Sequence, residues 1–152
     1  MIDNVFIFDC EVFAFDWLFV FKHKATGERT IIWNDSEAVR EFMRQEPLLA
    51  GFNNKHYDQF ILKAVLCDFT PEEVKRVNDF IIQGGHEGWE LSELRDCGIY
   101  FDQYDLMDDC QQGLSLKAIE AHLGMDIRET TVSFDLDRPL TEEERKEVEF
   151  YC

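Results

Sequence analysis

The chain has 152 residues, of which 32 are acidic and 15 are basic, so its formal net charge is −17. This length fits one domain of roughly 100–150 residues, and a content of 45% hydrophobic and 14% aromatic residues excludes a disordered chain. The excess of acid argues against a protein that holds nucleic acid through a basic surface of its own, so any such binding must be local, through metal ions or with a basic partner.

The cysteines and the N-terminus indicate the compartment. Five cysteines form an odd set without a CxxC pair, which predicts reduced, mostly buried thiols in a cytoplasmic protein and no structural zinc site. The first residues lack the basic region of a signal peptide, and no apolar run is long enough to span a membrane.

The first third of the chain predicts three antiparallel strands. Residues 5–8 form a continuous apolar run, residues 13–21 are rich in strand formers, and residues 24–28 are typical of a hairpin turn that returns through residues 30–33. The sequence Asn34-Asp35-Ser36 then offers N-caps for a first helix.

The rest of the chain alternates between strands and helices. A short buried strand at 48–52 leads through a polar turn to a helix, and the capping box that begins at Thr70 predicts a helix over 71–81. Residues 83–90 are the least structured stretch, and their glycines lack the strand-turn-helix context of a phosphate-binding loop. The remaining expected elements are a strand at 99–106, a helix from Ser115 that ends at Gly124, and a helix from a second capping box at Thr141.

A hairpin sheet followed by alternating helices and strands predicts one α/β domain over residues 1–152. Its mixed sheet should have roughly five strands, three antiparallel N-terminal ones plus parallel ones, with flanking helices and Asp9 on the central strand.

Asp9 and Glu11 are the first candidate ligands. Alternate residues of a strand point to the same face, so both carboxylates should project together, and hard cations such as Mg²⁺ prefer such oxygen ligands. An Asp-x-Glu at a strand end is also common in solvated turns, so the pair alone does not define a site.

The second candidate group follows the buried strand at 48–52. Asp58 should lie in the first turn of a helix, where the helix dipole stabilises a carboxylate, and Asn53 and Asn54 precede it. Each has a purely structural alternative, as an N-terminal charge or as a cap that holds the turn. Asp105 is expected to be structural, and Asp108 and Asp109 to lie in a solvated loop.

Together these segments resemble the motifs of the DEDD (DnaQ-like) 3′–5′ exonucleases. Asp9-Cys10-Glu11 is similar to the first motif and Asn53-Asn54 with Tyr57-Asp58 to the second, in the form found in the proofreading domains of phage-type family-B DNA polymerases. Residues 104–107 with 114–124 resemble the strand and helix that precede the third motif, and residues 147–152 resemble its beginning, so the resemblance covers nearly the whole chain.

The resemblance implies an RNase H-like fold and a site for two Mg²⁺ or Mn²⁺ ions. By the family's pattern, Asp9 would bridge the two ions, Glu11 would complete one, Asp58 would hold the other, and Tyr151 would orient the attacking water. The third motif reads Tyr-x-x-x-Asp, so its Asp would lie three positions beyond Cys152, and we expect the domain to be truncated and inactive for lack of this carboxylate.

The resemblance also implies the substrate and the partner. Asn53 and Asn54 would contact the single-stranded 3′ end of DNA, and Val12 and Phe13 would pack against its terminal nucleotide, with release of nucleoside 5′-monophosphates. A polymerase domain or another C-terminal continuation would supply the grip on DNA. Two alternatives stay open: a free-standing nuclease acting on RNA or host DNA, and an inactive protein-interaction scaffold of the same fold.

Overall fold

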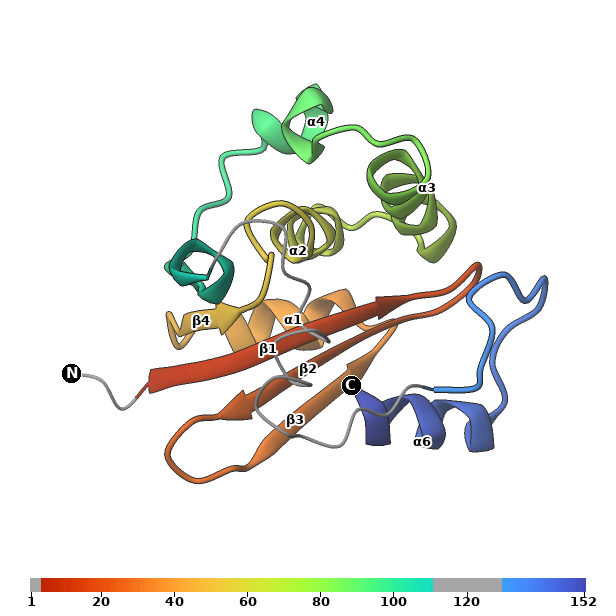
Figure 1. Cartoon of the computed structure of the whole chain (residues 1–152), viewed down its shortest axis with the longest axis horizontal. Helices are drawn as coiled ribbons and strands as arrows, with labels where there is room; N and C mark the ends of the chain where they lie inside the picture. The colour runs from red at the N-terminus through yellow and green to blue at the C-terminus, as the bar shows by residue number, and fades with distance from the viewer. Residues whose placement is uncertain (1–3, 111–129) are drawn as a thin grey trace.

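The computed structural model describes residues 4–110 and 130–152 and contains a five-stranded mixed sheet with helices on both faces (Figure 1). The strands are β1 (Val5–Val12), β2 (Trp17–His23), β3 (Arg29–Trp33), β4 (Leu48–Gly51) and β5 (Gln103–Asp105). The helices are α1 (Ser36–Met43), α2 (Asp58–Leu66), α3 (Pro71–Ile82), η2 (Gly88–Glu90), α4 (Ser92–Arg95), η3 (Leu106–Asp109) and α6 (Glu142–Tyr151).

The strand order is β3-β2-β1-β4-β5, which makes β1 the central strand. β2 pairs antiparallel with β1 and with β3, whereas β4 runs parallel to β1 and to β5. The predicted α/β class is therefore confirmed, with a mixed sheet and Asp9 on the strand at its centre.

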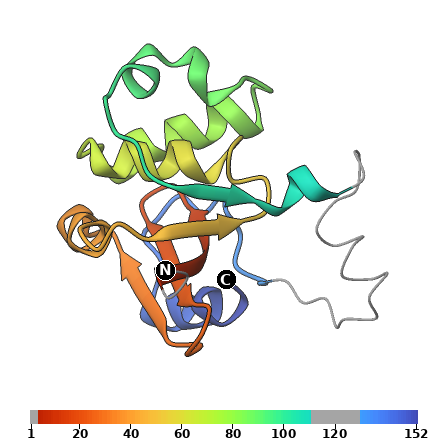
Figure 2. The ribbon, with the colours of Figure 1, turned by 90° about the vertical axis from the view of Figure 1, so that its left-hand side faces the viewer.

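The two faces of the sheet bury separate groups of apolar side chains. On β1, Phe6 and Phe8 point into the larger core under α1 to α4, while Ile7 and Asp9 point to the other face. That second face holds a smaller core under α6, around Leu18 and its neighbours. Figure 2 shows the helices of residues 58–95 on one side of the sheet and the blue helix α6 on the other.

The carboxylate of Asp16 connects the sheet to the segment that carries α6. Asp16 is 2% exposed and accepts hydrogen bonds from Asn34 Nδ2, Leu140 N and Arg145 Nη2, each at 2.7 Å. Asn34 in turn accepts the backbone N–H of Trp17 at 2.8 Å. One buried carboxylate therefore joins the start of β2, the end of β3 and the start of α6.

A second group of contacts holds the last turns of α6. Trp33 Nε1 donates to Glu149 Oε1 at 2.7 Å, and the guanidinium of Arg145 lies 5.1 Å from the centre of the Trp33 ring. Arg29 donates to the backbone oxygen of Glu149, and Val148 is 1% exposed. These contacts fix the C-terminal end of α6 against the sheet.

Several predicted boundaries differ from the structure. The first strand extends to Val12, and the second begins only at Trp17 because Phe13 N donates to Asp16 O at 2.7 Å in a tight turn. The strand predicted at 99–106 is limited to residues 103–105, because the side chain of Asp105 accepts the N–H of Met107 and starts the helical turn η3. Asp108 and Asp109 are exposed, as predicted, but they lie in η3 and not in a loop.

The glycine-rich stretch at 83–90 is more ordered than predicted, since it contains η2. Gly88 lies against the ring of Phe60, where an added Cβ would come within 2.2 Å of Phe60 Cγ. Glycine is needed there for close packing.

The helix predictions are confirmed where they can be compared. Thr70 and Thr141 both form the expected capping boxes, with Glu73 and Glu144, whereas the helix expected from Ser115 lies outside the described residues. All five cysteines are free, but the expectation of mostly buried thiols is wrong, because Cys10 alone is buried and the other four are partly exposed. Across residues 4–110 and 130–152, no helix is both long and apolar enough to cross a bilayer.

Replacement of Asp16 by alanine should destabilise the protein by about 2–4 kcal/mol, because three donors, among them the buried N–H of Leu140 and the half-buried Arg145, lose their acceptor. Urea denaturation measures this loss. Asp137→Ala, at an exposed aspartate, serves as the control and should stay within about 0.5 kcal/mol of the parent. Equal stability of the two variants would contradict the structural role of Asp16.

Candidate metal centre

Asp9 and Glu11 project from the same face of β1, beside the end of α6. In the antiparallel pairing of β1 with β2, Asp9 lies opposite Val20 and Glu11 lies opposite Leu18. Both β2 partners belong to the small core under α6. The two carboxylates therefore lie at the border of that core, as the alternation of the strand predicts.

A third potential ligand, Cys152, comes from the end of α6. One ligand atom from each of Asp9, Glu11 and Cys152 lies within 4.8 Å of the other two, and Cys152 Sγ donates to Asp9 Oδ2 at 3.8 Å. Sequence reasoning missed Cys152. The available signal was its spacing, because Cys152 follows the buried Val148 by four residues and so shares the inward face of the helix.

Asp58 lies close to this group without joining it. It is the first residue of α2, is 6% exposed, and its Oδ1 accepts a hydrogen bond from Cys10 Sγ at 3.0 Å. Cys10 points to the face of β1 opposite Asp9, so Asp58 approaches the strand from the side of the large core. The structure thus brings Asp9 and Glu11 together with Cys152, with Asp58 as a nearby fourth group.

The three carboxylates interact electrostatically. Burial, followed by the charges of Asp9 and Asp58, raises the pKa of Glu11 to about 8. Burial and the charge of Asp9 raise the pKa of Asp58 to about 7. Asp9 keeps an exposed edge, yet desolvation raises its pKa to about 6, and the N–H of Cys10, 2.9 Å from Asp9 Oδ1, partly offsets that rise.

No ion pair among residues 4–110 and 130–152 involves any of these three carboxylates. Crowded carboxylates without a cationic partner are characteristic of functional sites, since a fold gains nothing from such repulsion by itself. A bound divalent cation would reverse the local charge and favour the ionised carboxylates.

The second predicted motif has a mainly structural arrangement. Asp105 is 1% exposed and accepts the N–H groups of Asn53 at 2.7 Å and Lys55 at 3.1 Å, so its expected structural role is confirmed. Asn53 has a φ of 59° and is partly exposed. Asn54 is fully buried, and its Nδ2 donates to Gln103 Oε1 at 3.0 Å, so its polar group faces the protein interior.

The remaining predicted substrate contacts are not open to solvent. Val12 and Phe13 are 3% and 1% exposed, and Phe13 stacks on Phe134 with ring centres 4.9 Å apart.

Tyr151, the residue predicted to orient the attacking water, is 37% exposed at the end of α6, where its ring packs edge-on with Phe150. The assigned roles of these residues stay predictions.

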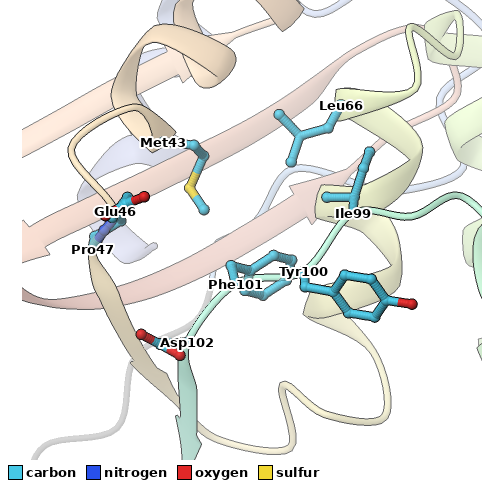
Figure 3. Close-up of a pocket in the computed structure, with 8 residues that line it drawn as sticks. All are labelled: Met43, Glu46, Pro47, Leu66, Ile99, Tyr100, Phe101 and Asp102. Carbon is cyan, nitrogen blue, oxygen red and sulfur yellow. The ribbon is translucent and has the colours of Figure 1, made fainter.

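A cavity of about 390 Å³ lies elsewhere, between the end of α1 and the amino ends of β4 and β5 (Figure 3). Its lining residues are Met43, Glu46, Pro47, Leu66, Ile99, Tyr100, Phe101 and Asp102. This cavity has both polar and apolar lining surface but no group of converging ligands, and it lies at the end of the parallel strands opposite Glu11 and Asp58.

Comparison with known proteins gives no relative: no family model matches the chain, and neither the curated proteins nor the solved structures contain a match.

The crowding of the carboxylates predicts the pH dependence of stability without metal. Because Glu11 holds its proton up to about 8 in the folded protein and only to about 4.5 when unfolded, the folded form binds more protons between these values. Stability should therefore fall as pH rises through this window, and Glu11→Gln should reduce the fall by about 1–3 kcal/mol.

Urea denaturation in the presence of a chelator, repeated across that pH range, measures the slope. The exposed Glu93 provides the matched control, and Glu93→Gln should leave the slope of the parent unchanged. A parent protein whose stability rises with pH over the same window would show that Glu11 is not held in a crowded, desolvated position.

Proposed function

We propose that the chain is a metal-dependent 3′–5′ exonuclease domain of RNase H-like fold, which acts on single-stranded DNA and proofreads for a polymerase. The observation that carries the proposal is the convergence of Asp9 and Glu11 within a group of three potential ligands, with Asp58 in electrostatic contact. The five-stranded mixed sheet with Asp9 on its central strand is compatible with that fold.

The residues fit divalent cations. Asp9, Glu11 and Asp58 offer the carboxylate oxygens that Mg²⁺ and Mn²⁺ prefer, and no described ion pair neutralises them. When bound, a pair of such ions activates a water molecule on one side of a phosphate and stabilises the leaving oxygen on the other.

The protein's own groups have distinct tasks on this proposal. Asp9, together with Glu11 and Asp58, would hold the ions through carboxylate oxygens. Tyr151, which is partly exposed at the end of α6, would orient the water. The contacts of Trp33 and Arg29 with Glu149 keep that end of the helix against the sheet.

The scaffold alternative also has support in specific residues. Asn54, Val12 and Phe13 are buried, so the expected contacts with a nucleotide require their rearrangement or other residues in their place. The net charge of −17 also disfavours nucleic acid away from the metal ions. Metal binding separates the two proposals, because a scaffold has no need of it.

Mn²⁺ should raise the melting temperature of this chain, because a ligand that binds only the native state stabilises it by about 2.7 kcal/mol at one hundred times its dissociation constant. Asp9→Asn should remove the effect, whereas Asp137→Asn, a change of the same chemistry at an exposed position, should retain it. A melting temperature that does not change when Mn²⁺ is added would favour the inactive protein-interaction scaffold.

Cleavage is tested with α6 extended by three residues, Ala-Ala-Asp, against the matched extension Ala-Ala-Asn. The added carboxylate would lie four residues after Tyr151, on the same helix face, and should raise the rate of cleavage at least about 10-fold over the amide. The assay is the shortening of 5′-labelled single-stranded DNA from its 3′ end in Mn²⁺, with an RNA strand of the same sequence in parallel. Equal rates for both extensions would contradict the ligand set, and faster cleavage of RNA would contradict the substrate.

A further inference from the structure

The group of three potential ligands contains a sulfur atom, which the exonuclease resemblance does not account for. Cys152 Sγ belongs to the same cluster as Asp9 and Glu11, within 4.8 Å of a ligand atom of each. The contact joins two segments 143 residues apart and depends on the docking of α6. Cys152 N still donates to Val148 O at 2.9 Å, so Cys152 continues the helix and its position is fixed by the helix geometry.

The spacing of the three groups is close to that of ligands on one ion. Zinc binds sulfur at about 2.3 Å and carboxylate oxygen at about 2.0–2.2 Å, so two ligands of a tetrahedral site lie roughly 3.5 Å apart. Small rotations of Asp9 and Glu11, which lie at an exposed edge of the core, would bring the donors to that spacing.

The kind of donor determines which ion is preferred. Mg²⁺ takes oxygen ligands almost exclusively, whereas a thiolate favours zinc and other thiophilic ions. A site with two carboxylates and one thiol therefore differs from a pure magnesium site. It offers three ligands of the kind used in catalytic zinc sites, which keep a fourth position open.

We propose that Cys152 Sγ is a direct metal ligand, so that Asp9, Glu11 and Cys152 bind a thiophilic divalent cation of the Zn²⁺ class in competition with Mg²⁺ or Mn²⁺. On binding, the S–H bond breaks, a metal–sulfur bond forms and the proton passes to solvent. The competition rests on the proposed function, since the same two carboxylates serve both ions. Zinc would then inhibit the exonuclease by replacing the ions it needs.

The electrostatics of the site are consistent with ligation that depends on the ion. Without a cation, burial and the charges of Asp9 and Glu11 raise the pKa of the Cys152 thiol well above its ordinary range. A bound divalent ion reverses this balance, because a thiol that coordinates a metal is deprotonated outright.

The other nearby thiol offers an internal comparison. Cys10 is buried on the opposite face of β1 and donates to Asp58, so it points away from the three-ligand group. Cys67 and Cys97 interact with each other at a distance from the site and could bind thiophilic ions themselves. Both are therefore best replaced by serine before the measurement.

The experiment is a titration of the Cys67→Ser/Cys97→Ser protein with CdCl₂, followed by the ultraviolet charge-transfer absorbance of the cadmium–thiolate bond. We expect one saturable absorbance step in this background. Adding Cys152→Ser should abolish the step and weaken Cd²⁺ binding at least about 10-fold, while Cys10→Ser should retain it. ZnCl₂ should displace Cd²⁺ and remove the absorbance, and circular dichroism should confirm that each variant is folded.

A step that survives Cys152→Ser, or that disappears in Cys10→Ser alone, would overturn the assignment of Cys152. The measurement is independent of nuclease activity. Mn²⁺ stabilisation that requires Asp9, without a cadmium–thiolate step, would leave the exonuclease proposal intact and reject the sulfur ligand. A cadmium–thiolate step that requires Cys152, in a protein that never cleaves DNA, would support the sulfur ligand and reject the exonuclease proposal.

Discussion

The attachment of α6 to the sheet is the constraint on which the candidate site depends. The strand β1 supplies Asp9 and Glu11, but Cys152 reaches them only because α6 lies across the opposite face from the larger helical layer. Asp16 provides the polar part of that attachment, and its carboxylate is satisfied by donors from three separate segments. Packing of Val148 supplies the apolar part. The ligand geometry is thus a tertiary property, set by contacts made well away from the ligands.

Two kinds of acidic residue in this fold have opposite physical characters. Asp16 and Asp105 are buried, and each accepts several hydrogen bonds, so their charges are compensated and they stabilise turns and a helix. Asp9 and Glu11 are crowded with Asp58 instead, and the pKa of each of the three is raised. No ion pair among the described residues compensates the charges of these three carboxylates, and the proposed metal site rests on this difference.

The sequence was informative where the structure is local. Alternation along a strand placed Asp9 and Glu11 on one face, and the capping boxes at Thr70 and Thr141 marked two helix starts, because these effects act over a few residues. Burial of Asn54 and the role of Asp16 could not be predicted, since their partners are distant in the chain. The contact of Cys152 belongs to the same class. The sequence shows that Cys152 shares a helix face with Val148, but it does not show which face of α6 packs against β1.

The acidic surface constrains how the proposed exonuclease could work. A protein with a net charge of −17 gains no affinity from releasing counterions along a phosphate backbone, so attraction must be concentrated where divalent ions reverse the sign of the charge. Such a site can hold one or two phosphates and repels the rest of the strand. Firm binding of a long strand would then require a separate basic surface, whereas brief visits by a frayed 3′ end would not. Because each visit is short, the rate of delivery by a partner would decide how often the end is cleaved. An acidic domain with a local metal centre is therefore better suited to a tethered proofreading role than to free digestion of nucleic acid.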